Sequence, residues 1–251
     1  MKCSTISYSR IKNFNMCPFR YYLESVLKKK MPLGPSVFQG SLMHSVIEEF
    51  IKNRDAVKKD YSKQLIEMIN KEYEKLNYAF DDEDTVKKTV YDMVSKVFEM
   101  NFFSSDFVST EKFFTVSISD MVVNGVADVV RRVDEDTIEI IDWKSSKKKP
   151  KYDEQRLDLQ PRLYDICLRE MYPEYPNVLV SFYYLRHKKP DYLFYYTDEE
   201  REETIRSLKQ TVRDIRRLRH PERRKTWMCK CFCNPEVCDA EWEKYLKTRK
   251  R

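Results

Sequence analysis

The chain has 251 residues, of which 41% are hydrophobic and 14% aromatic, so it can bury a core within one domain and is not expected to be disordered. Its three glycines leave no Gly-rich loop of the kind that cradles nucleotide phosphates. Lysine and arginine number 47 against 41 acidic residues, and the net charge of +6 favours polyanionic partners. Because the chain has neither a secretory signal nor an apolar stretch of about eighteen residues, we expect a cytoplasmic protein with no membrane contact.

The first hundred residues carry apolar side chains at helical spacing. From Ser7 to Leu27 this spacing is interrupted by Pro18, which predicts two helices or one broken helix. The same spacing predicts three further helices, over Val37–Lys52, Lys58–Asn77 and Thr85–Phe102.

After these helices the pattern alternates between apolar and polar residues. Phe113–Ile118 and Met121–Arg131 are the first predicted strands, and the dipeptide Asn124-Gly125 fits a tight hairpin turn or a bulge. The elements expected next are a strand Thr137–Trp143, a helix Asp153–Met171, strands Val178–Arg186 and Tyr192–Tyr196, and a helix Asp198–Leu218. This order predicts an α/β fold with a mixed central sheet flanked by helices.

Two carboxylates and a lysine lie at the ends of neighbouring predicted strands. Asp142 and Lys144 close the apolar strand in IEIIDWK and share one face, and Asp128 lies in the strand before it, in GVAD. Hydrolysis of a phosphodiester needs an activated water and neutralisation of the growing charge, which Mg²⁺ or Mn²⁺ can supply. Asp128, Asp142 and the backbone carbonyl of Trp143 are suitable oxygen ligands, and Lys144 could orient or deprotonate the water. A bare D-x-K is more often a surface ion pair, but the apolar strand and the second acid favour a nuclease.

These segments resemble the RecB-like branch of the PD-(D/E)xK nuclease superfamily, and in particular the compact iron-sulfur nucleases found beside CRISPR systems and in phages. SYSRIKNFNMCPFRYYLE resembles the opening segment of that family, GSLMHSVIEEF its glycine-x-x-x-histidine helix, GVAD and IDWKSSKK its two acidic motifs, and QPRLY its glutamine-x-x-x-tyrosine signature. The resemblance covers nearly the whole chain. It implies that His44, Asp128 and Asp142 are metal ligands and that Gln160, Tyr164 and Lys144 belong to the active site.

Some residues near these motifs need a separate interpretation. Pro161 is unusual inside a helix, so we expect a helix to begin there, with Gln160 just outside its first turn. Glu48 and Glu111 are further acids, to which no role is assigned.

The cysteines form a second group, because four of the seven lie in CKCFCNPEVC near the carboxyl end. Such crowding in an intracellular chain indicates a metal site rather than disulfides. The resemblance implies a [4Fe-4S] site that joins the two chain ends, with ligands Cys17, Cys229, Cys233 and Cys238. The spacing departs from the C-x2-C-x5-C of the family, so Cys231 is the alternative middle ligand, and zinc is the alternative metal. Cys3 and Cys167 are expected to be unliganded, with Cys167 buried in its helix.

Basic and aromatic residues are interleaved at Arg20–Tyr22, at Lys147–Lys151 and at Arg223–Lys225 before Trp227. Such mixtures suit single-stranded DNA, because cations follow the phosphates while aromatic rings stack on bases. We therefore expect a metal-dependent DNA exonuclease acting on single-stranded ends. The alternative is a nucleic-acid-binding or processing subunit that acts with a protein partner in recombination or CRISPR spacer acquisition. A pure binding module would retard a DNA strand without shortening it.

The expected organisation is a single nuclease domain over residues 1–251. It comprises a helical N-terminal part at residues 1–105, a catalytic α/β core at residues 106–200, and a C-terminal helix with the metal-cluster segment at residues 201–251.

Overall fold

The computed structural model describes residues 5–29, 34–57, 60–76, 78–102, 106–225, 229, 233 and 235–249. Pro18 breaks the first helical segment as predicted, because α1 ends at Met16 and α2 begins at Pro18. The helices of the N-terminal part are α1 (Tyr8–Met16), α2 (Pro18–Tyr21), a π-helical turn (Tyr22–Val26), α3 (Pro35–Lys52), a 3-10 turn (Arg54–Ala56), α4 (Ser62–Lys75) and α5 (Glu83–Glu99). None of the described helices is both long and apolar enough to cross a membrane.

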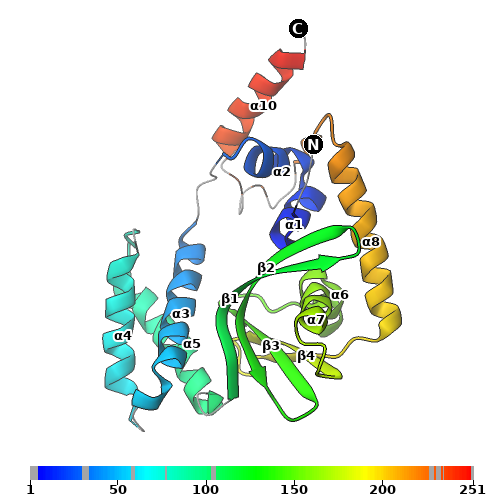
Figure 1. Cartoon of the computed structure of the whole chain (residues 1–251). Helices are drawn as coiled ribbons and strands as arrows, with labels where there is room; N and C mark the ends of the chain where they lie inside the picture. Colours follow the sequence, from blue (N-terminus) through cyan, green and yellow to red (C-terminus); the bar gives the residue numbers. More distant parts are fainter. Residues whose placement is uncertain are drawn as a thin grey trace.

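A five-stranded sheet follows, with its strands side by side in sequence order (Figure 1). The strands are β1 (Asp106–Ile118), β2 (Met121–Arg132), β3 (Thr137–Lys144), β4 (Asn177–Tyr184) and β5 (Asp191–Phe194). β3 and β4 run parallel, and the other neighbours are antiparallel. The crossover between β3 and β4 consists of α6 (Tyr152–Leu157) and α7 (Leu159–Met171). The predicted mixed α/β sheet is confirmed.

Both faces of the sheet are covered by helices, which is why β3 is buried at nearly every position. Ile140 of β3 packs in a cluster with side chains of α7 and α8 (Asp198–Arg217), whereas the next residue, Ile141, packs in a second cluster with α3, α4 and α5. In Figure 1, α3, α4 and α5 accordingly lie on one side of the sheet and α7 and α8 on the other. The end of β3 is held firmly between these two layers.

The N-terminal helix α2 and the start of the C-terminal helix α10 (Pro235–Arg249) lie together at the top of the molecule as drawn (Figure 1). α10, which was not predicted as a separate helix, lies next to α2. The ring centroids of Phe19 and Trp242 are 4.7 Å apart, and Cys17, Leu23 and Cys238 pack in the same small cluster.

The prediction of a turn or bulge at Asn124-Gly125 was wrong. Both residues lie inside β2, where Gly125 pairs with Phe114 of β1, and the hairpin turns instead at Ser119, whose φ is 56°. A Cβ atom at position 125 would lie 2.2 Å from Cζ of Phe114, so glycine is needed to admit the neighbouring ring. The first strand also begins earlier than expected, at Asp106.

The predicted helix Asp153–Met171 is divided in two. Asp158 has extended backbone angles and caps the second helix, α7, by accepting a hydrogen bond from the backbone N–H of Gln160. An aspartate at this position favours a new helix start over continuation of the first helix.

Candidate active site

Asp142 and Lys144 end the central strand β3, and their side chains meet on one face of the sheet. Lys144 Nζ lies 2.7 Å from Asp142 Oδ1, as expected for residues two apart on a strand. Asp142 is 4% exposed, and burial raises the pKa of its carboxyl, an effect that Lys144 opposes and Asp128 reinforces. The charge on this carboxylate therefore depends on a neighbouring cation.

Asp128, on the neighbouring strand β2, lies beside this pair. Its Oδ2 accepts a hydrogen bond from the backbone N–H of Trp143 at 2.8 Å, which ties β2 to the end of β3. The Trp143 indole is buried in the cluster on the opposite face of the sheet, where its ring centroid is 5.0 Å from that of Phe102. Only the backbone of Trp143 can therefore reach the site.

His44 is brought to Asp128 by α3, and its Nδ1 lies 3.3 Å from Asp128 Oδ2. One turn earlier on the helix is Gly40, where a Cβ atom would lie 3.0 Å from Oγ of Ser145. Glycine thus allows α3 to approach the end of β3 closely. Burial lowers the pKa of His44, but the carboxylates of Asp128, Asp142 and Glu111 together outweigh burial and raise that pKa to about 8.

Glu111 of β1 joins His44 and Asp128 in a group that could hold a cation. Each of the three offers a ligand atom, and these atoms lie within 4.8 Å of one another. Burial, together with Asp128, raises the pKa of the Glu111 carboxyl, and its φ of 43° is uncommon for a residue other than glycine. Sequence analysis left Glu111 without a role because no motif spacing connects it to the other acids.

Gln160 and Tyr164 complete the group from α7, one turn apart on one face. The Gln160 side chain accepts a hydrogen bond from Lys144 Nζ at 3.1 Å and donates one to Asp142 Oδ2 at 2.8 Å. The Tyr164 hydroxyl lies 3.0 Å from the same carboxylate oxygen and 3.1 Å from the backbone carbonyl of Val126. The predicted site residues thus lie in one group of neighbouring side chains, which comprises His44, Asp128, Asp142, Lys144, Gln160 and Tyr164.

The start of α7 differs slightly from the expectation. The helix begins at Leu159, so Gln160 lies within its first turn rather than just outside it. Pro161 is tolerated there because first-turn N–H groups have no partner within the helix. The cap residue Asp158 also accepts a hydrogen bond from the Tyr8 hydroxyl at 3.2 Å, which connects α1 to the helix that carries Gln160.

The pairing of His44 with Asp128 predicts that cation binding depends on pH. An imidazole must be neutral to bind a metal ion, whereas a pKa of about 8 keeps His44 protonated at lower pH in the cation-free protein. We therefore expect the apparent affinity for Mn²⁺ to fall about tenfold per pH unit below pH 8 and to level off above it. Calorimetric titration of Mn²⁺ over this range measures the effect. An affinity independent of pH in the wild type would remove His44 from the ligand set.

The cysteine group joins the two ends of the chain. Cys17 is buried, its sulfur accepts a hydrogen bond from the backbone N–H of Arg224 at 3.4 Å, and it packs in one cluster with Cys238. Burial, opposed by Arg20 and reinforced by the nearby thiols of Cys229, Cys238 and Cys17, raises the pKa of Cys233 to about 11. Four thiols would suit a metal by their chemistry. Among the described residues, however, the group of three or more side chains placed to hold a cation is His44, Glu111 and Asp128, so the cysteine metal site stays a prediction.

Of the three remaining cysteines, the structure describes Cys167. Cys167 is 1% exposed in α7, and burial, followed by Glu170, raises its pKa to about 12, as expected for an unliganded core thiol. Cys3 and Cys231 lie outside the described residues.

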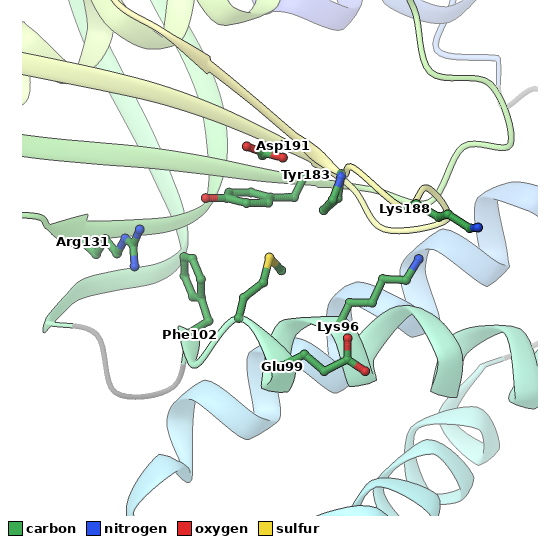
Figure 2. Close-up of a pocket in the computed structure, with 9 residues that line it drawn as sticks. Lys96, Glu99, Phe102, Arg131, Tyr183, Lys188 and Asp191 are labelled. Carbon is green, nitrogen blue, oxygen red and sulfur yellow. The ribbon is translucent and has the colours of Figure 1, made fainter.

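A cavity of about 510 Å³ lies on the face of the sheet opposite the side chains of Asp142 and Lys144, and it is not part of the candidate active site (Figure 2). Phe102 and Tyr183 line it, together with the end of α5. Two of its cations are engaged, because Lys96 Nζ donates to two backbone carbonyls that follow β4 and Arg131 pairs with buried Glu139. Figure 2 also shows Glu99 and Asp191 around the cavity, so the charges that line it are of both signs.

The sequence matches the model of the PD-(D/E)XK nuclease superfamily over residues 5–241. The chain therefore belongs to this superfamily and is a nuclease. The crystal structure titled "Putative exonuclease" from Eubacterium rectale superposes with a TM-score of 0.59 at 14% identity, over 90% of this chain and 86% of that one, which shows a shared fold. The structure of SSO0001 covers 92% of this chain and 83% of its own at 15% identity, but its TM-score of 0.40 is too low to bear on the fold. Among curated proteins, none matches the sequence.

Proposed function

We propose that this nuclease is a metal-dependent DNA exonuclease that hydrolyses phosphodiester bonds at single-stranded ends. The observation that carries the proposal is the convergence of His44, Asp128, Asp142 and Lys144 from α3, β2 and β3. Two carboxylates beside an imidazole suit Mg²⁺ or Mn²⁺, which supplies an activated water and neutralises charge on the phosphoryl oxygens.

The cation would be held by His44, Asp128 and Asp142 together with the backbone carbonyl of Trp143. Glu111 is a further candidate ligand, because its carboxylate lies within reach of His44 and Asp128. The oxygen donors would come from two strands and the nitrogen donor from α3, and a phosphate oxygen of the substrate would add a further ligand to the cation.

Lys144 would orient the attacking water and assist its deprotonation. Gln160 is a positioning residue, because its carboxamide bridges Lys144 Nζ and Asp142 Oδ2. Tyr164 acts in the same way on Asp142, since its hydroxyl contacts one carboxylate oxygen and burial keeps the pKa of that hydroxyl high, so that it stays a neutral donor.

The cysteine group would hold a [4Fe-4S] cluster, as in the RecB-like iron-sulfur nucleases that the sequence resembles. The ligands proposed are Cys17, Cys229, Cys233 and Cys238, and the role proposed is structural, because the group joins α2 to α10. Zinc is the alternative metal for the same thiolates. Visible absorption that a reductant bleaches supports the cluster, whereas a colourless protein with bound zinc contradicts it.

Single-stranded DNA is the proposed substrate because of the basic loop after β3. Two of the arginines that the sequence suggested for DNA binding already form ion pairs within the protein, Arg20 with Glu24 and Arg223 with Asp239. In the loop, Lys147 and Lys148 are exposed. The amine of Lys149 lies over the ring of Tyr192 on the edge strand β5, 3.8 Å from its centroid, and donates to the backbone carbonyls of Lys189 and Asp191. A cation next to an aromatic ring suits a phosphate beside a stacked base.

A timed digestion tests this function. Strands labelled at the 5′ or the 3′ end are incubated with Mn²⁺, with and without chelator, beside a closed circular duplex of the same sequence. We expect stepwise shortening from one end of the single strand, loss of activity with chelator, and no cleavage of the circle. Equal cleavage of the circle and the single strand would contradict the proposal. Retardation of the strand without shortening would indicate a binding subunit instead.

A further inference from the structure

A smaller cavity, of about 200 Å³, lies directly beside the candidate active site. Gln160 and Tyr164 line this cavity, and both also contact the Asp142 carboxylate. A group bound in the cavity would therefore be separated from that carboxylate by a single side chain. The cavity was not foreseen from the sequence, because its walls come from α1, β1, β2 and α7.

The walls of the cavity are largely apolar and aromatic. The rings of Phe114 and Tyr164 meet edge to face, with centroids 6.5 Å apart, and Leu163 lies in the same wall. Gly125 also lines the cavity, at the position where any Cβ would collide with the Phe114 ring. Pockets for drug-sized ligands hold roughly 300–1,000 Å³, so this one suits a single planar ring system and not a base pair.

One polar atom of a residue in the wall has no hydrogen-bond partner within the part of the chain that the structure describes. Asn124 Oδ1 is buried and has no hydrogen-bond partner among the described residues. A buried acceptor without a donor is costly, so a ligand that brings an N–H group would be favoured. Two hydroxyls, those of Ser7 and Ser9, also line the cavity and lie 3.1 Å apart.

The wall formed by the N-terminal segment is fixed in place. The backbone of Ile6 forms a parallel bridge to β2, with its N–H donating to the carbonyl of Val122 at 2.9 Å and its carbonyl accepting from the N–H of Asn124 at 2.7 Å. This segment leads into α1, whose Tyr8 contacts the cap of α7. The cavity is thus held from both sides by backbone and side-chain contacts.

We propose that this cavity receives one unpaired nucleobase of the DNA strand, next to the phosphodiester bond that is cleaved. The inference rests on the proposed function and names the subsite that recognises its substrate. Each of the four bases has an aromatic face and at least one N–H donor, so each can satisfy Asn124 and no strict base preference is expected. In a duplex the bases are stacked and their donors are paired, so a base must leave the helix to enter. The cavity therefore favours single-stranded ends.

An abasic scan tests the subsite. Single strands in which one nucleotide at a time is replaced by an abasic residue are compared with the intact strand, by binding to the wild-type protein in chelator and by cleavage in Mn²⁺. We expect one position, adjacent to the cleaved bond, at which loss of the base weakens binding and slows cleavage about tenfold. At all other positions the effect should be smaller.

A pair of asparagine variants assigns the effect to this cavity. Asn124→Ala should weaken binding of the intact strand about fivefold and leave binding of the strand that is abasic at the sensitive position unchanged. Asn177→Ala, at the exposed start of β4, is the matched control and should bind both strands as the wild type does. If Asn124→Ala does not fold, Ser9→Trp tests the same point, because an indole at the exposed Ser9 position would block the cavity and abolish the difference between the two strands.

The outcomes separate this inference from the proposed function. Equal binding and cleavage of the intact strand and every abasic strand would overturn the base subsite and leave the exonuclease proposal standing. Binding that depends on the base at one position, without any cleavage in Mn²⁺, would support the subsite and overturn the exonuclease proposal.

Discussion

Replacing Lys144 by alanine should lower the rate of strand cleavage by about 10²–10⁴-fold and leave the fold intact. Lys144 Nζ is 2.7 Å from Asp142 Oδ1 and 3.1 Å from Gln160 Oε1, and in the proposed function it orients the attacking water. Its removal also takes away the cation that opposes burial of Asp142, so the pKa of that carboxyl should rise further in the cation-free protein. The Lys144 side chain is 26% exposed at a strand end, so its truncation leaves no closed cavity.

Single-turnover cleavage of an end-labelled single strand measures this loss, and thermal unfolding by circular dichroism checks the fold. Lys188→Ala is the matched control, because Lys188 is an exposed lysine that lines the larger cavity on the opposite face of the sheet. It should cleave at the wild-type rate. Activity of Lys144→Ala within about tenfold of the wild type, in a preparation free of contaminating nuclease, would remove Lys144 from the mechanism.

If the cysteine group holds the proposed [4Fe-4S] cluster, replacing Cys17 by serine should abolish the visible absorption of that cluster and lower the melting temperature of the protein. Cys17 is 6% exposed and packs with Phe19, Leu23 and Cys238, so loss of its thiolate would release the contact between the two chain ends. Loss of a metal site belongs to the small set of changes with large effects on stability. If the free energy of unfolding falls by about 3 kcal/mol, the melting temperature should drop by roughly 6–12 °C for a chain of this size.

Iron and zinc content per chain, recorded with the absorption spectrum, distinguishes loss of the cluster from simple destabilisation. Cys167→Ala is the control, because Cys167 is also buried but lies in α7, in a different hydrophobic cluster. It should retain full metal content even if it melts earlier. Unchanged metal content in Cys17→Ser would exclude Cys17 as a ligand.

Sequence patterns predicted the parts of the site that lie on a single element. Alternation along a strand places Asp142 and Lys144 on one face, and the 2.7 Å contact between them follows from that geometry. Helical periodicity places Gln160 and Tyr164 on one face of α7, and their side chains are hydrogen-bonded to each other. Both relations depend on local backbone geometry, which the residue order determines.

The errors in the sequence analysis arose where a local preference competed with a contact from another element. Asn124-Gly125 favours a turn locally, but the Phe114 ring on the neighbouring strand requires the glycine inside β2. Arg223 looked available for DNA but pairs with Asp239 of α10, a helix that was not foreseen. Such partners are visible only when the elements are packed.

The sequence by itself determined the mixed α/β fold, the strand-end pair Asp142 and Lys144, and the membership of the chain in a nuclease superfamily. Only the tertiary structure decided that His44 reaches Asp128, that Glu111 joins them, and that a base-sized cavity opens beside Gln160. The reason is that these contacts join separate elements, and their distances depend on how both faces of the sheet are packed, which no spacing along the chain encodes.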